Sequence, residues 1–154
     1  MRANALAAAA LLAIAGAANA QTAGNGGLAE TNVAKAQKWG LIGSWAPECN
    51  APPSRSNGYL TYVVSGSEVI HQREFGDARD SNNVMGIRLL TDGIEITTNF
   101  QSLNPPQTRT YEYVRDGNRW HAKYNYNVAD NTYTIRDFTI VSNGQPAVWA
   151  YKCK

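Results

Sequence analysis

His71 and Arg73 lie two positions apart in a predicted strand, at positions that alternate with Ile70, Gln72 and Glu74. In an extended strand such residues share one face, and a two-residue turn at Gly66-Ser67 would place Tyr62 opposite His71. A few convergent polar groups within an apolar pocket form the usual small-molecule site. We therefore predict that Tyr62, His71 and Arg73 make a polar spot on the inner face of the domain.

The opposite strand parity is the alternative, in which Ile70 and Gln72 face inward and His71 lies at the surface. If Arg73 faces inward, burying its charge without a partner is costly, so the guanidinium must meet a ligand anion or an acidic or carbonyl group. An apolar ligand with one carboxylate or a similar acceptor is the simplest expectation.

The second half of the chain is dense in tyrosine and tryptophan. Aromatic side chains could line a cavity or stack on a sugar or an aromatic ligand, although core packing and cross-strand pairs explain most such residues in a sheet. We predict that four of them line the interior together with the polar spot: Tyr111, Tyr113, Trp120 and Tyr124.

Signatures of catalysis and of metal binding are missing from the sequence. No serine lies in a G-x-S-x-G elbow, and His121 alternates with Trp120 and Ala122, so it is expected to face outward. If the two cysteines pair with each other, only two histidines remain, which are too few ligands for a structural zinc site. We expect no cofactor, no metal and no enzymatic activity.

Cys49 and Cys153 are the only cysteines. In an exported protein the oxidising environment favours a disulfide between them; two free thiols or an intermolecular bond are the alternatives. They follow the first and the last predicted strand, which are neighbours in a closed sheet and are expected to run toward the same end. The disulfide therefore favours closure of the sheet.

Residues 1–20 have the composition of a cleaved signal peptide. Arg2 precedes an apolar stretch, Ala5 to Ala18, and residues 18–20 form an A-x-A cleavage sequence that would leave Gln21 first. The stretch is too short and too rich in alanine to span a bilayer, which takes about 20 strongly apolar residues. We predict a periplasmic or secreted protein with no membrane span after cleavage.

The charge of the chain is nearly balanced. Removing residues 1–20 takes away only Arg2 of the 14 Lys+Arg, which leaves 13 against 12 Asp+Glu. No segment concentrates the basic residues, so neither a nucleic-acid footprint nor a polybasic membrane patch is predicted. The expected partner is a small hydrophobic molecule or a protein.

A single β domain is predicted for residues 39–154. Residues 21–38 form a flexible lead or a short helix, because Leu28 to Lys38 is rich in helix-favouring residues. From Trp39 onward, short runs rich in Tyr, Val, Ile and Thr are separated by turn residues, which is typical of an all-β domain. Nine strands are expected: 40–47, 58–64, 69–75, 84–91, 94–101, 108–115, 119–126, 132–141 and 147–152. The fold class is therefore all-β, a small antiparallel up-and-down barrel of eight or nine strands, with a β-sandwich as the alternative.

Two turns set the registers of their hairpins. A two-residue type I′ loop at Asp92-Gly93, in which glycine supplies the positive φ, puts apolar residues of both strands on one face: Leu89 opposite Ile96, Ile87 opposite Thr98 and Met85 opposite Phe100. A turn at Gly117-Asn118 gives a second such set: Arg115 opposite Trp120, Tyr113 opposite Ala122 and Tyr111 opposite Tyr124. Each register agrees with one buried face, which supports both hairpins.

Long connections fall at one end of the predicted sheet and tight turns at the other. The long set comprises residues 47–57, 76–83, 102–107 and 127–131. The sheet is expected to resemble a cup with these loops around its mouth.

Gly43-Ser44-Trp45, near the start of the first predicted strand, resembles the G-x-W opening of the lipocalins and the wider calycin barrels. In that family the tryptophan packs across the closed end of the barrel, often against a basic residue near the last strand, for which Arg136 or Lys152 could serve. The resemblance implies an eight-stranded up-and-down barrel that holds a small apolar ligand. The T-D-Y signature of the family is missing, because Thr91-Asp92 is followed by Gly93. The chain also resembles small exported β proteins of Gram-negative bacteria.

The leading expectation is an exported binding protein that holds a small apolar or amphipathic ligand in the interior or mouth of a barrel. One alternative is an inhibitor of a protease or of lysozyme that acts through the mouth loops. The other is a barrel enzyme, such as an isomerase or cyclase, that uses His71. A roomy cavity would favour the binding protein, and a packed interior would favour the inhibitor. A buried His71 that is hydrogen-bonded to an acid would favour the enzyme.

Overall fold

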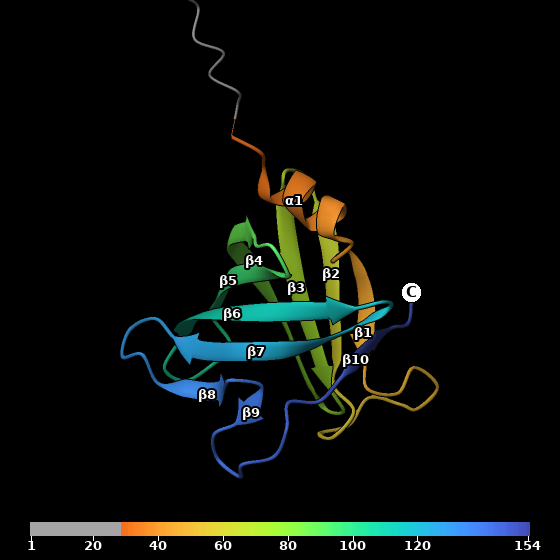
Figure 1. Cartoon of the computed structure of the whole chain (residues 1–154), viewed down its shortest axis with the longest axis vertical. Coiled ribbons are helices and arrows are strands. Elements are labelled where there is room, and N and C mark those ends of the chain that lie inside the picture. The colour runs from red at the N-terminus through yellow and green to blue at the C-terminus, as the bar shows by residue number, and fades with distance from the viewer. Residues whose placement is uncertain (1–28) are drawn as a thin grey trace, which may run out of the picture.

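The computed structural model describes residues 29–154 of the chain (Figure 1). The predicted signal peptide, residues 1–20, lies outside the described residues. One helix, α1 (Asn32–Trp39), precedes the strands. The strands are β1 (Gly43–Ala46), β2 (Tyr59–Ser65), β3 (Glu68–Phe75), β4 (Ala78–Leu89), β5 (Gly93–Phe100), β6 (Gln107–Asp116), β7 (Arg119–Asn127), β8 (Tyr133–Arg136), β9 (Thr139–Ile140) and β10 (Ala150–Lys152).

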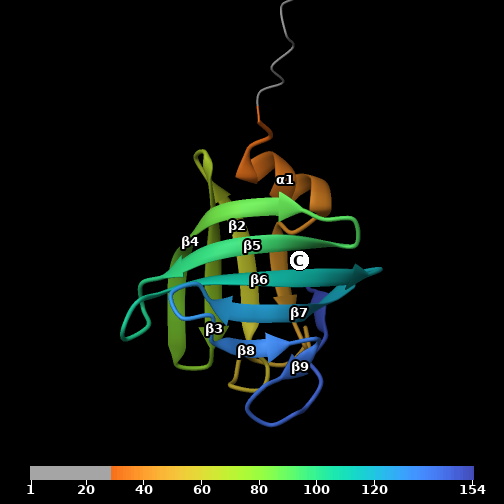
Figure 2. The same cartoon turned by 60° about the vertical axis from the view of Figure 1, so that its left-hand side comes forward.

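The strands close into an antiparallel barrel (Figures 1 and 2), which confirms the predicted all-β fold class. From β1 to β9 each strand pairs with the next one along the chain, and β10 pairs with both β1 and β7. The ring therefore contains β1 to β7 and β10. The hairpin of β8 and β9 extends from β7 outside this ring.

The predicted strand 132–141 is wrong, because this segment is a hairpin. Asp137 and Phe138 have φ values of 48° and 62° and turn the chain between β8 and β9. Aspartate tolerates this conformation but phenylalanine seldom takes it, so Asp-Phe carries only a weak turn signal in the sequence. The N–H of Phe138 donates to the carbonyl of Lys123 at 2.9 Å, which ties the turn to β7.

Helix α1 lies across one end of the barrel (Figure 1). The side chain of Thr31 accepts from the N–H of Ala34 at 3.1 Å and caps its start, and Gly40 ends it in the left-handed conformation with φ of 81°. Ala36 is fully buried against the barrel core. The mouth of the barrel is the opposite end, where the loop that follows β1 lies.

Two basic side chains bind the carbonyl end of α1. Arg115 donates to the carbonyl of Trp39, and Lys152 Nζ donates to that of Gly40 at 3.1 Å. Cations stabilise this end of a helix because its free carbonyls carry partial negative charge.

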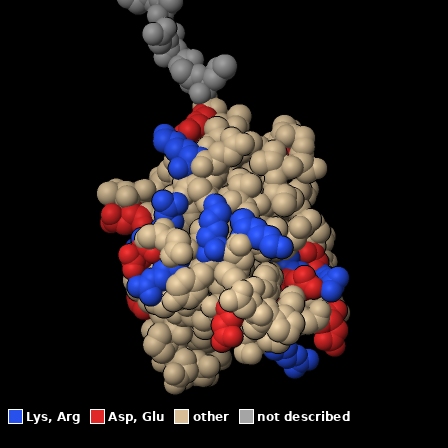
Figure 3. Space-filling view, turned by 90° about the vertical axis from the view of Figure 1, so that its right-hand side faces the viewer, with Lys and Arg blue, Asp and Glu red and all other residues tan. Residues whose placement is uncertain are grey.

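The face of the molecule shown in Figure 3 has Lys and Arg near its middle with Asp and Glu on either side, so the surface there carries mixed charge.

The β4–β5 hairpin has the predicted inner face but a longer loop. Leu89 pairs with Ile94 and Ile87 with Ile96, and residues 90–92 connect the two strands. Each predicted partner is therefore wrong by two positions. A slip of two positions preserves the face of every side chain, because strands alternate with a period of two.

A bulge in β4 overturns one predicted inward residue. The register shifts between Val84 and Gly86, and Met85 is turned to the surface, where it is 62% exposed. Val84 is buried in the core instead. The predicted pair of Met85 and Phe100 does not form, because a bulge leaves its extra residue unpaired.

The substitution Gly93→Val is expected to destabilise the fold by about 1–3 kcal/mol. The reason is close packing: Gly93 lacks the positive φ that the type I′ turn predicted, but a Cβ there would lie 2.5 Å from the carbonyl oxygen of Tyr113. Gly86→Val is the matched control, since a Cβ at Gly86 meets nothing within 4 Å. Equal urea midpoints for the two variants would contradict this packing.

Two of three predicted pairs in the β6–β7 hairpin are confirmed. Arg115 pairs with Trp120, and Tyr113 with Ala122. The register then shifts, so that Tyr124 pairs with Glu112 instead of Tyr111. This one-residue shift reverses the face of Tyr124.

The mouth has fewer long loops than predicted. β3 and β4 are joined by Gly76 and Asp77 alone, so the long connection expected at residues 76–83 is wrong. The long connections that remain at this end of the ring are residues 47–58, 101–106 and 128–132.

The predicted disulfide between Cys49 and Cys153 is confirmed, with Cα atoms 5.2 Å apart. β1 and β10 are neighbours as expected, but they run antiparallel, because the β8–β9 hairpin replaces one predicted strand. Cys49 reaches its partner because the chain after Ala46 turns back beside β10, where Cys49 Sγ lies 3.9 Å from the carbonyl oxygen of Tyr151. A disulfide is compatible with an oxidising compartment.

Candidate functional site

Tyr62 and His71 face each other inside the barrel, as the turn at residues 66–67 predicts. They are a cross-strand pair of β2 and β3 and are 0% and 2% exposed. Their rings stack with centroids 4.4 Å apart, and the rings of Phe100 and His71 meet edge to face with centroids 5.7 Å apart. The alternative with His71 at the surface is therefore wrong.

Three buried tyrosine hydroxyls join His71 in one hydrogen-bond network. The Tyr62 hydroxyl lies 3.3 Å from that of Tyr111 and 3.1 Å from that of Tyr113. The Tyr111 hydroxyl also bonds Thr98 Oγ1 at 2.7 Å and His71 Nδ1 at 3.1 Å. Burial raises the pKa of all three tyrosines, that of Tyr111 to about 12, so the network is neutral and fills the interior beneath the mouth.

His71 is held in its neutral form. Burial lowers its pKa to about 3, the charge of Arg73 acts in the same direction, and Asp80 opposes both. Among the described residues, neither His71 Nε2 nor the neighbouring Asn82 Oδ1 has a hydrogen-bond partner. No carboxylate bonds to the ring within residues 29–154, so the feature that would favour an enzyme is missing there.

Arg73 has the acidic partner that its inward position requires. Its Nε donates to Asp80 Oδ1 at 2.9 Å, and a second bond joins the other guanidinium nitrogen to Oδ2. Burial tends to raise the pKa of Asp80, but hydrogen bonds from Arg73, Ser102 and Asn82 outweigh it and hold the pKa at about 2. The guanidinium also lies 4.2 Å from the centre of the Phe100 ring. The protein itself neutralises Arg73, so a ligand anion is not needed there.

Tyr124 was predicted to line the interior, and this is wrong. The shifted register puts it on the outer face opposite Glu112, where its hydroxyl donates to Glu95. Glu95 also pairs with Arg88, with 2.9 Å between nitrogen and oxygen. The bulge in β6–β7 causes the reversal, and nothing in the local sequence marks its position.

An apolar cavity of about 290 Å³ lies at the mouth of the barrel. Tyr113 and Trp120, stacked with centroids 3.7 Å apart, belong to its wall and connect it to the tyrosine network below. The volume is close to the lower end of the roughly 300–1,000 Å³ of ligand pockets, which suits a small ligand. Most of the other wall residues are apolar, among them Leu60, Phe75, Ile135, Ile140, Ala147 and Trp149.

A stack of side chains on the outer face holds the segment that covers this cavity. His121 faces outward as predicted, but its ring lies between Phe138 at 4.5 Å and Trp149 at 3.8 Å. The guanidinium of Arg119 lies 4.2 Å from the centre of the Trp149 ring. The stack fixes residues 137–149 against β7, and this segment supplies one side of the cavity wall.

The 47–58 loop supplies another side of the wall and is braced from within. The side chain of Asn57, which is 7% exposed, accepts from the N–H of Glu48 at 2.9 Å and donates to the carbonyls of Glu48, Ala51 and Pro52. The Tyr59 hydroxyl lies 2.9 Å from the carbonyl oxygen of Ala51. These bonds and the adjacent disulfide give the loop one defined conformation.

Trp45, the tryptophan of Gly43-Ser44-Trp45, packs at the end of the barrel where α1 lies. Trp45 is 1% exposed, and its Nε1 donates to the carbonyl of Leu41, just after α1, at 2.8 Å. Lys152 Nζ lies 5.3 Å from the centre of its ring, so Lys152 is the basic residue that packs against Trp45. Arg136 lies over Tyr133 instead, at 5.4 Å.

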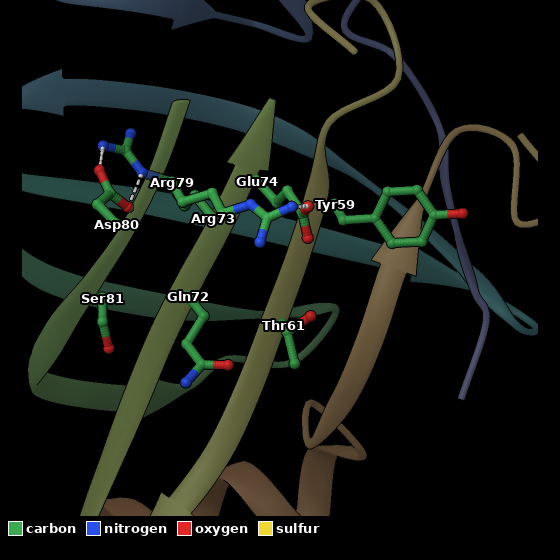
Figure 4. A pocket seen from close by; sticks show the side chains of 8 residues that line it. All are labelled: Tyr59, Thr61, Gln72, Arg73, Glu74, Arg79, Asp80 and Ser81. Carbon is green, nitrogen blue, oxygen red and sulfur yellow. Dashed lines mark hydrogen bonds and ion pairs between the residues drawn. The ribbon is translucent and has the colours of Figure 1, made fainter. Parts of the chain in front are cut away.

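A second hollow, of about 370 Å³, lies on the outer face of β2, β3 and β4 (Figure 4). Its side chains are largely polar, and Arg79 pairs with Glu74 at 2.6 Å. The polar side chains of Thr61, Gln72 and Ser81 form one cross-strand row in it. Tyr59 is the only aromatic residue that lines it, and no aliphatic side chain does, so the mouth cavity is the better candidate for the predicted ligand.

The structure brings together six of the seven predicted site residues and adds others that the sequence did not suggest. Tyr62, His71 and Tyr111 lie in the packed base, Arg73 is paired, and only Tyr113 and Trp120 reach the cavity. Arg55 and Ala147 were missed as wall residues. Their loops cross the mouth through long-range packing, for which no local pattern exists.

Comparison with known proteins adds no relative, because no family model, curated protein or solved structure matches the chain. Within residues 29–154, no cluster of three or more His, Cys, Asp or Glu residues could hold a metal ion. No helix in that range combines the length and apolar character needed to cross a bilayer.

Proposed function

We propose that the protein binds a small apolar or amphipathic molecule in the cavity at the mouth of its barrel. The cavity itself carries this proposal, since its wall is mostly apolar and it rests on the stacked rings of Tyr113 and Trp120. Burying the apolar surface of a ligand there contributes roughly 25 cal/mol per Å². The packed network beneath and the braced loop beside it supply a wall that needs little reordering on binding.

Export to the periplasm or to the outside of the cell is part of the proposal. The disulfide supports an oxidising compartment, and the composition of residues 1–20 supports cleavage of a signal peptide. A carrier of a small ligand in that compartment fits both features.

An inhibitor of a protease or of lysozyme is the second candidate, because the braced 47–58 loop is what a rigid protein-binding surface requires. Ser54 and Asn57 exchange backbone hydrogen bonds at 3.1 and 3.2 Å, so the loop tip is a tight turn. A tight turn is less suited to a protease cleft than an extended segment. We do not propose catalysis, because His71 is sealed beneath the cavity.

Titration with 1-octanol, followed by tryptophan emission, is expected to give saturable binding to the wild-type protein. Ala147→Phe should weaken binding at least tenfold, because Ala147 is 4% exposed and lines the cavity. Ala129→Phe adds the same bulk to an exposed loop residue and should bind as the wild type does. Absence of saturable binding by the folded wild type, or unchanged binding by Ala147→Phe, would overturn the proposal.

A further inference from the structure

The wall of the mouth cavity carries charge of one sign only. Arg55 is the one charged residue in the wall, and no Asp or Glu lines it. Arg55 is exposed and makes no ion pair within residues 29–154. An arginine presents a planar fork of donors that fits a carboxylate or a similar anion.

The backbone beneath Arg55 is fixed even though its side chain is exposed. Arg55 lies in the tight turn between Ser54 and Asn57, and the Asn57 side chain ties that turn to Glu48, Ala51 and Pro52. The guanidinium is therefore held within reach of the cavity rim, and binding an anion there requires only side-chain ordering.

A second cation lies behind the wall. Arg109 is 9% exposed inside the barrel and has no carboxylate within ion-pair distance among the described residues. Its guanidinium donates to neutral oxygens: Asn125 Oδ1 at 2.7 Å, Gln107 Oε1 at 2.8 Å and Thr134 Oγ1 at 3.0 Å. Asn125 belongs to the cavity wall. Asp130 acts on this charge from beyond ion-pair distance, and the part of the charge that it does not offset adds positive potential at the cavity, because the interior has a low dielectric constant.

We infer that the ligand is a small amphiphile with one anionic head group, a carboxylate or a sulfonate, whose apolar body occupies the cavity while its head group pairs with Arg55. This inference rests on the proposed function of the cavity. It assigns the anion to Arg55 instead of Arg73, since Asp80 already neutralises Arg73. The small volume, about 290 Å³, favours a short apolar body over a long acyl chain.

Calorimetric titration with octanoate and with 1-octanol separates the head group from the apolar body, since both have the same chain length. Arg55→Gln is expected to weaken octanoate binding about fivefold and to leave 1-octanol binding within twofold of the wild type. Arg136→Gln removes the same charge from an exposed arginine outside the cavity wall and should leave both affinities unchanged. Added salt should weaken octanoate binding alone, because it screens exposed charges.

The outcomes distinguish the inference from the function on which it rests. If neither compound binds, the cavity function fails and the inference fails with it. If both bind but Arg55→Gln affects neither, the cavity function stands and the anionic ligand is overturned. If Arg136→Gln weakens octanoate as much as Arg55→Gln does, only net charge matters and the contact with Arg55 is overturned.

Discussion

Replacing both Cys49 and Cys153 with alanine is expected to reduce the free energy of unfolding by about 4.7 kcal/mol, within a measured range of roughly 0–5. The two cysteines are 104 positions apart, so the bond closes a long loop in the unfolded chain and removes much of its conformational entropy. It also holds the start of the 47–58 loop beside β10. A change of this size is a large part of the stability of a typical domain, which is about 5–15 kcal/mol.

Urea unfolding of three samples measures this effect: the oxidised wild type, the reduced wild type and the double alanine variant. The reduced protein and the variant should unfold at nearly the same urea concentration, well below the oxidised protein. Coincidence of all three transitions would contradict a stabilising bond between these residues, and so would two free thiols in non-reducing peptide mapping.

Acidification from pH 7 to pH 4.5 is expected to remove roughly 2–3 kcal/mol of stability through His71 alone. Its pKa is 6.5 in the unfolded chain and about 3 in the fold, so the folded state keeps a neutral imidazole that the unfolded state protonates. A base with a lowered folded pKa contributes stability that is present above pH 6.5 and is lost as the pH falls toward 3. Asp80 acts below this window, since its pKa falls from 3.8 to about 2 and its contribution is lost only as the pH approaches 2.

The variant His71→Gln should therefore lose less stability than the wild type between pH 7 and pH 4.5, by roughly 2–3 kcal/mol. His121→Gln is the matched control: burial and Arg119 also lower the pKa of His121, but it is half-buried on the outer face and should change the pH dependence much less. Urea unfolding at both pH values gives the numbers. Parallel pH dependence for the wild type and His71→Gln would mean that His71 is not sealed in the core.

Near tight turns, the sequence predicts which side chains of a strand face the interior. It does not predict where a β-bulge interrupts the strand. The turn at residues 66–67 put Tyr62 opposite His71, and Gly117-Asn118 put Tyr113 opposite Ala122, because two-residue loops leave one register. The bulges that expose Met85 and reverse Tyr124 depend on how neighbouring strands coil around the barrel. No propensity of the local residues marks them.

The pairing of Arg73 with Asp80 could have been predicted from the sequence. Residues 76–83 were predicted to be a loop, but Gly76 and Asp77 form a two-residue turn, and this turn places Asp80 directly opposite Arg73. The cavity could not be predicted from the sequence, because its wall is formed by β2, β7, the 47–58 loop and the segment before β10. Their meeting depends on closure of the ring and on the aromatic stack around His121.

Amide and indole resonances of the ¹⁵N-labelled wild-type protein, recorded during titration with 1-octanol, test the central claim most directly because they locate the ligand. A ligand in the mouth cavity should shift the Trp120 indole resonance and the amides of Leu60 and Ala147, while Thr61, Gln72 and Ser81 on the outer face remain in place. Shifts confined to that outer row, or a spectrum unchanged by the ligand, would contradict the claim that the mouth of this barrel is its binding site.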